Sequence, residues 1–195
     1  MKNDIILAGV GGQGILSIAA IIGYAAVQAG LSSKQSEVHG MSQRGGEVQS
    51  HLRLSTAEIF SDLIPFGGAD MILSVEPMEA LRYLPYLAPH GWVITSTTPF
   101  KNIPNYPAEQ ALLQEITALP QHVALDAEAL ANELGAAKSA NIVMLGAAAP
   151  FLALPFAKLQ EGIQFIFGRK GEKVVAANSN ALAAGRAVAE KQRSA

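Results

Sequence analysis

Apolar and amphipathic stretches alternate along this chain. A short apolar run over 4–8 predicts a buried strand, and the long apolar stretch over 15–29 predicts a buried helix. Gly30 stands where a helix-ending glycine is expected. The same patterns predict strands over 47–54, 71–75, 91–96 and 122–125, and helices over 77–84, 107–118 and 127–134. Because strands and helices alternate, we expect an α/β fold of three layers, in which helices cover both faces of a mostly parallel sheet.

Two regions depart from this alternation. The segment 32–46 is polar and irregular, so we expect a loop there. The last third is predicted to be helical, over 139–149, 156–167 and 173–192. No internal repeat or low-complexity linker divides the chain, and we expect residues 1–195 to form a single domain with a Rossmann-like first strand and helix.

Composition narrows the function classes. Hydrophobic residues make up 50% of the chain and charged residues 15%, which indicates either a surface that contacts a partner or simply the abundance of alanine and glycine. The formal net charge of −2, without any Lys/Arg cluster, argues against nucleic-acid binding, because phosphate backbones require clustered cations. The sequence has no cysteine, which excludes thiolate-bound iron–sulfur clusters, disulfides and thiol nucleophiles in this chain.

The beginning of the chain does not resemble a signal peptide, because an acidic residue precedes a short apolar stretch that runs directly into glycines. Two longer apolar segments, 14–31 and 141–156, contain polar residues or prolines. Buried helices explain them better than membrane spans. We therefore expect a cytoplasmic protein without membrane contact.

The strongest local motif is the glycine-rich segment 9–14. Gly9, Gly11 and Gly14 have the G-x-G-x-x-G spacing between a predicted strand and a predicted helix. Such a turn favours an anion, because its N–H groups and the positive end of the helix dipole point at the same place. A dinucleotide site would also need an acid after the second strand, and Glu37 lies near that distance but in the irregular segment. A glycine turn needed only for close packing is the other interpretation.

A second polar cluster spans 36–46 and contains three glycines. His39 is a candidate general acid or base, since the ordinary pKa of histidine lies near neutrality. Arg44 is a candidate for binding a carboxylate or phosphate in bidentate fashion. No nucleophile motif, paired carboxylates or metal-binding histidine pair stands beside them. A loop with only a structural role is the competing interpretation.

These two motifs, in this order, resemble the gamma-type domain of the pyruvate/2-ketoisovalerate:ferredoxin oxidoreductase superfamily. The resemblance rests on the G-x-G-G-Q-G turn at 9–14 and on Arg44-Gly45-Gly46 followed by the predicted strand 47–54, and it covers nearly the whole chain. The sequence of residues 37–46 is most similar to the indolepyruvate branch of this family.

The resemblance implies a division of labour. The chain would be the non-thiamine subunit of an enzyme that oxidises a 2-oxoacid, such as indolepyruvate or another aryl pyruvate, to an acyl-CoA and passes electrons to ferredoxin. Thiamine diphosphate, magnesium and iron–sulfur clusters would belong to a large alpha subunit, with coenzyme A as co-substrate and no catalysis by this chain alone. It also implies a binding role, without catalytic or metal-ligating residues, for Gly9, Gly11, Gly12, Gln13, Gly14, His39, Arg44, Gly45 and Gly46.

Two other classes stay open at this point. The glycine motif is also compatible with a stand-alone oxidoreductase that binds NAD(P) or a flavin. A scaffold protein that uses the same fold only for assembly is the second alternative.

Overall fold

The computed structural model describes residues 1–39 and 45–193, and in this part of the chain six strands form one sheet. The spatial order of the strands is β2-β3-β1-β4-β5-β6. Strands β1, β4, β5 and β6 pair in parallel, whereas β3 lies antiparallel between β1 and β2. The bounds are β1 Lys2–Val10, β2 Ser32–His39, β3 Glu47–Ser55, β4 Ala69–Ser74, β5 Leu87–Ser96 and β6 His122–Leu125. The predicted α/β fold with a mostly parallel sheet is confirmed.

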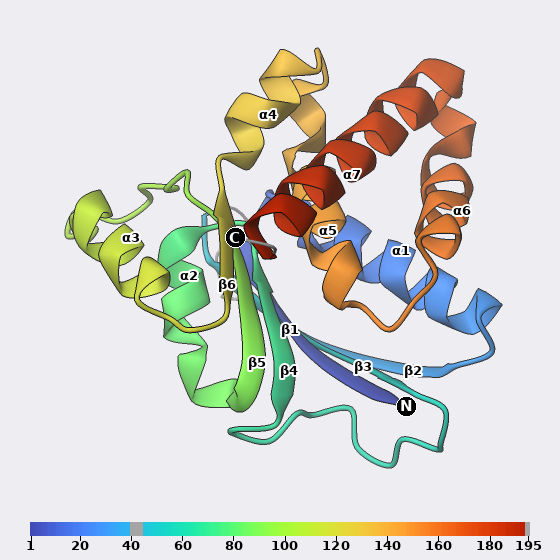
Figure 1. The fold of residues 1–195 in the computed structure, drawn as a ribbon, viewed down its shortest axis with the longest axis horizontal. Helices are drawn as coiled ribbons and strands as arrows, with labels where there is room; N and C mark the ends of the chain where they lie inside the picture. Colours follow the sequence, from blue (N-terminus) through green and yellow to red (C-terminus); the bar gives the residue numbers. More distant parts are fainter. Residues whose placement is uncertain (40–44, 194–195) are drawn as a thin grey trace.

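Helices cover the sheet on both faces (Figure 1). One face is covered by α1 (Ile15–Gln28) together with three helices of the C-terminal third, α5 (Ala140–Ala148), α6 (Phe156–Phe167) and α7 (Glu172–Arg193). The other face carries α2 (Pro77–Arg82) and α3 (Glu109–Thr117), and α4 (Ala127–Glu133) follows the end of β6. Short 3-10 helices span Leu84–Tyr86, Ala137–Ser139, Ala149–Phe151 and Gly168–Lys170.

Strand β1 lies at the centre of the hydrophobic core. Ile5 and Leu7 pack with α1, α5 and α6, while Ile6 and Ala8 pack on the opposite face with residues of α2. All four side chains are fully buried. A strand that is buried on both faces reads as a continuous apolar run, which is why the sequence revealed it.

Glycines bring α5 and α7 into backbone contact. A Cβ atom at Gly146 would overlap the carbonyl oxygen of Leu182, and one at Gly185 would overlap the carbonyl oxygen of Val143. This close crossing fixes the long helix α7 against α5. The C-terminal end of α7 lies beside β6 (Figure 1), where Gln192 Nε2 donates to the carbonyl of Ala124 at 2.9 Å. In the parts 1–39 and 45–193, no helix is long and apolar enough to cross a membrane; the cytoplasmic location stays a prediction.

The prediction of a loop over 32–46 is wrong for residues 32–39, which form β2. This strand pairs with β3 in a regular register from Ser32 opposite Ser55 to His39 opposite Val48. Backbone hydrogen bonds to β3 hold this strand. Because it lies at the edge of the sheet, its side chains can be polar on both faces. The sequence therefore lacked the apolar alternation that usually identifies a strand.

The end of α1 agrees with the sequence. Gly30 has a left-handed φ of +75°, and Leu31 N–H donates to the carbonyl of Ala26 at 2.9 Å. This Schellman arrangement ends the helix at a residue that tolerates positive φ.

Candidate functional site

The glycine turn 9–14 connects the carboxyl end of β1 to α1, and close contacts require glycine at two of its positions. A Cβ atom at Gly9 would overlap Val75 Cγ2, and one at Gly14, where φ is +82°, would lie 2.5 Å from Asn141 Nδ2. Gly12 differs, because its φ is +103° and a Cβ atom there would meet nothing within 4 Å. The turn is thus packed tightly at both ends and open in the middle.

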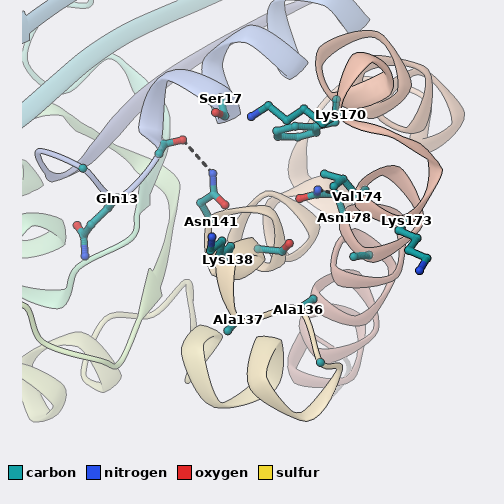
Figure 2. Close-up of a pocket in the computed structure, with 16 residues that line it drawn as sticks. Gln13, Ser17, Ala136, Ala137, Lys138, Asn141, Lys170, Lys173, Val174 and Asn178 are labelled. Carbon is teal, nitrogen blue, oxygen red and sulfur yellow. Dashed lines mark hydrogen bonds between the residues drawn. The ribbon is translucent and has the colours of Figure 1, made fainter.

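Gln13 holds the shape of this turn. Val10 N–H donates to its Oε1 at 2.8 Å, and its Nε2 donates to the carbonyl of Val75 at 3.5 Å. Figure 2 shows the amide group turned toward the sheet. Because both amide atoms have protein partners, the side chain stabilises the turn and leaves ligand contact to the neighbouring backbone.

The structure brings the two sequence motifs together. Gly11 N–H donates to the carbonyl of Gly46 at 2.8 Å, and Gly45 N–H donates to the carbonyl of Gly11 at 3.4 Å. His39 ends β2 opposite Val48. The role predicted for the His39 side chain and that for Arg44 lie outside what the structure describes. Of the predicted binding residues, Gly9 to Gly14 and Gly45–Gly46 therefore form one continuous unit.

A cavity of about 800 Å³ lies beside the glycine turn (Figure 2). Its walls come from Gly12 to Gly14, from the segment 135–141 and from the start of α7. Lys138, Lys170 and Lys173 line it, and within the described ranges none of them forms an ion pair. Lys170 extends toward Ser17, whereas Lys173 lies at the rim with its amine pointing outward. A cavity of this size is typical of small-molecule sites.

The electrostatics of this cavity favour an anion. Gly12 and Gly14 line it, and their N–H groups have no hydrogen-bond acceptor among the residues that the structure describes. Helices α1 and α5 both begin at the cavity, so the positive ends of two helix dipoles add to the lysine charges. Unpaired N–H groups and cations around one concave space are the usual means of binding phosphate.

Asn141 connects α5 to the turn, since its Nδ2 donates to the carbonyl of Gly14 at 3.0 Å. On its other side lies a second cavity of about 350 Å³, which shares Gly12 and Lys138 with the first. Uncharged residues form most of the wall of this second cavity, and its two charged residues, Glu128 and Lys138, have opposite charges. Together the two cavities suit a ligand with an anionic end and a neutral arm.

A comparison with known protein families decides the assignment. The family described as pyruvate ferredoxin/flavodoxin oxidoreductase matches residues 4–188. The chain belongs to this oxidoreductase family. Curated relatives include two proteins named indolepyruvate oxidoreductase subunit IorB. The one from Thermococcus kodakarensis is 39% identical over 82% of this chain and 82% of its own length, and the one from Pyrococcus horikoshii is 40% identical over 75% and 76%.

Solved structures of the family confirm the fold. A keto/oxoacid ferredoxin oxidoreductase gamma subunit from Geobacter sulfurreducens has a TM-score of 0.72 and 23% identity, covering 97% of this chain and 99% of its own. The 2-oxoglutarate:ferredoxin oxidoreductase from Magnetococcus marinus, solved with 2-oxoglutarate, coenzyme A and succinyl-CoA, has a TM-score of 0.77 and 23% identity. The match covers 97% of this chain but 31% of that larger chain. The resemblance of the sequence motifs to this family is confirmed by the family match over residues 4–188.

Within the family fold, the acid considered for a dinucleotide site has a different place. Glu37 lies on β2, which β3 separates from β1. In a dinucleotide-binding domain, the acid follows a strand that neighbours the glycine-turn strand. The arrangement therefore gives no support to NAD binding at this turn.

Sequence reasoning missed the lysines and Asn141, which belong to a part of the chain noted only for its helices. Lys138 and Lys170 lie in 3-10 helices, and Lys173 lies in the first turn of α7. Lysines near helix starts, where they oppose the helix dipole, are a signal that could have identified them. In the described residues there is no group of three or more His, Asp or Glu residues that could hold a metal ion.

Proposed function

We propose that this chain is the small subunit of an indolepyruvate oxidoreductase complex and that its cavity binds the phosphate-bearing end of coenzyme A. Family membership and identities near 40% to curated subunits of that name support the first part. The observation that carries the second part is the meeting of three lysines and two glycine N–H groups around one cavity, none of which has an ion-pair or backbone partner in 1–39 and 45–193.

The cavities match the chemistry of coenzyme A. This molecule has a pyrophosphate and a ribose phosphate at one end and an uncharged arm that ends in a thiol. In the proposal, Lys138 and Lys170 neutralise the phosphates while the N–H groups of Gly12 and Gly14 donate to them. The smaller cavity beyond Asn141 accepts part of the neutral arm. The chain thereby holds and orients the co-substrate.

The remaining chemistry belongs to a large partner subunit in this proposal. Thiamine diphosphate, magnesium and iron–sulfur clusters would reside there and supply decarboxylation of the 2-oxoacid and electron transfer to ferredoxin. The absence of cysteine from this chain agrees with that division, because cluster ligation needs thiolates. The chain alone is accordingly expected to be inactive.

The subunit assignment is tested by isolating the tagged chain from its native cells. We expect a brown eluate that contains a larger, cysteine-bearing subunit and reduces a dye with indolepyruvate and coenzyme A. Mass spectrometry and the visible absorption spectrum identify the partner. A colourless chain without such a partner contradicts the assignment.

The coenzyme site is tested with the double variant Lys138→Ala/Lys170→Ala in the assembled complex. The KM for coenzyme A should rise about tenfold, as expected for the loss of a charge-assisted hydrogen bond, while kcat stays near its original value. Lys158→Ala/Lys191→Ala is the matched control, because it also removes two lysine charges, from positions that line neither cavity. An unchanged KM in the double variant would show that the cavity does not bind the coenzyme.

A further inference from the structure

Glu76 is a fully buried carboxylate at the carboxyl end of β4, next to the glycine turn. Its Oε2 accepts from Glu79 N–H at 2.8 Å, which caps helix α2. Its Oε1 accepts from Phe100 N–H at 3.2 Å and from the hydroxyl group of Tyr106. All three donors are uncharged groups, and two of them belong to the loop 97–108 that follows β5.

Capping α2 does not require a glutamate. One acceptor oxygen is sufficient for an N-cap, and the shorter side chains of serine, asparagine and aspartate are the preferred caps. Burying a carboxylate away from water is costly unless several donors compensate it. The second oxygen of Glu76 therefore has a use beyond the cap, and the two contacts to Phe100 and Tyr106 show which segment it holds.

The backbone of Glu76 is itself fixed by a neighbouring side chain. Ser74, which is also fully buried, donates its hydroxyl group to the carbonyl of Glu76 at 2.6 Å and accepts from Glu76 N–H at 3.2 Å. Burial and the contact with Glu76 raise the pKa of Tyr106 well above its usual value, so its hydroxyl group stays a donor. Glu76 is thus held firmly by Ser74, and Tyr106 in the loop remains its hydrogen-bond donor.

The held loop returns to the glycine turn. Asn102, which lies between the two anchored residues, donates its Nδ2 to the carbonyl of Gly45. Gly45 in turn contacts Gly11 through its N–H group, and Val75, the neighbour of Glu76, accepts from Gln13. Hydrogen bonds and short backbone segments thus form a closed ring. It runs from the glycine turn to Val75 and Glu76, from Glu76 to the loop 97–108, and from Asn102 through Gly45 back to the turn.

From this ring we infer that Glu76 is a positioning residue for the coenzyme site, holding loop 97–108 so that Asn102 keeps Gly45–Gly46 against the glycine turn. The inference rests on the proposed function, since it names the anchor of that same site. Glu76 itself does not line either cavity beside the turn. It acts through Phe100, a wall residue of the smaller cavity, and through Asn102.

The test uses Tyr106→Phe and Asn102→Ala in the assembled complex, because removal of Glu76 itself endangers folding. Each variant should raise the KM for coenzyme A about tenfold with little change in kcat, as expected when one hydrogen bond to a buried charged group or to a shaped loop is lost. The double variant should raise the KM by much less than the product of the single effects, since both contacts act through one loop. Tyr86→Phe is the control, a loss of the same hydroxyl group at the opposite edge of the sheet.

A second readout reports on the loop without the coenzyme. Trypsin should cut after Lys101, which lies in the loop, faster in Tyr106→Phe than in the unmodified complex. Faster cutting with an unchanged KM would mean that Glu76 holds the loop but does not position the site, and unchanged cutting would mean that it does not hold the loop; either result overturns the inference. If the unmodified complex shows no saturable dependence on coenzyme A, the proposed function itself fails, and this inference fails with it.

Discussion

A buried carboxylate holds a long loop at each end of the parallel strands, at their amino ends (the amino edge) and at their carboxyl ends (the carboxyl edge). The two carboxylates differ in whether a cation balances their charge. At the amino edge, the buried carboxylate of Asp4 pairs with Arg53, whose Nη1 donates to the carbonyls of Ser61 and Leu63 in loop 56–68 at 3.0 Å each. At the carboxyl edge, Glu76 holds loop 97–108 with uncharged donors only. The charge of Asp4 is balanced by Arg53, whereas Glu76 lies near a cavity lined by lysines that have no ion-pair partner among the described residues.

This difference separates stability from binding. A carboxylate that is paired with a guanidinium group has no net charge to offer a ligand. When one partner of such a pair is removed, the other charge stays buried without compensation, which is unfavourable. The carboxyl edge keeps its positive potential available, because the lysines around the cavity have no carboxylate partner in the described ranges. Changes at the amino edge should therefore affect folding, and changes at the carboxyl edge should affect coenzyme binding.

The largest effect is expected for Arg53→Ala. In the part of the chain that the structure describes, this variant leaves Asp4, which is 1% exposed, with the exposed Lys2 as its one charged partner. The free energy of unfolding should fall by about 3 kcal/mol, the lower end of the range for a broken buried pair. Urea unfolding measures the loss. The KM for coenzyme A in the assembled complex should stay unchanged.

Arg186→Ala is the control for that prediction, because its ion pair with Glu190 and its contact with the ring of Phe156 are partly exposed and should together contribute at most about 2 kcal/mol. Equal losses for the two arginine variants, or a raised KM in Arg53→Ala, would refute the separation between the two edges.

A smaller effect on stability, with an effect on binding, is expected for Gly14→Ala. The left-handed conformation of Gly14 should destabilise the variant by about 1–2 kcal/mol, and the added Cβ atom would lie 2.5 Å from Asn141 Nδ2. The displaced Asn141 should raise the KM for coenzyme A. Thermal unfolding and steady-state kinetics measure the two effects.

Gly30→Ala makes the matched comparison, because Gly30 also has positive φ but lies outside the site with open space around it. It should lose stability by a similar amount without any change in KM. A KM that rises equally in both variants would mean that general destabilisation, and not the shape of the turn, changes the kinetics.

The smallest effect concerns pH and the amino edge. Burial lowers the pKa of His51, with Asp62 opposing and Arg53 adding to the shift, and its Nδ1 accepts from Ile64 N–H at 2.9 Å in loop 56–68. Because the folded pKa lies below the unfolded value near 6.5, the unfolded chain binds the proton more readily. Stability should fall as the pH drops through 6.5, by at most about 1.4 kcal/mol per pH unit.

Urea unfolding at pH 7.5, 6.5 and 5.5 measures this slope. In His51→Asn the amide oxygen can accept the same N–H group without titrating, so the slope between pH 6.5 and 5.5 should become shallower. An identical slope in both proteins would show that another group is responsible.

The first strand, the glycine turn and α1 could be predicted because their signals are local: a strand buried on both faces, glycines at fixed spacing and a helix-ending Gly30. The edge strand β2 could not, because backbone pairing with β3 stabilises it without an apolar pattern. The cavity was also hidden, since Lys138 and Lys170 meet Gly12 only through the packing of α5 and α7. The anchor at Glu76 depends on Tyr106, thirty positions away in the chain.

The most direct test of the account is the activity of the purified large subunit with and without this chain, measured as dye reduction that depends on indolepyruvate and coenzyme A. The account predicts that activity appears only when the chain is added and that the chain alone has none. Full activity of the large subunit without the chain, with the same KM for coenzyme A, would contradict it and leave the chain the role of a scaffold.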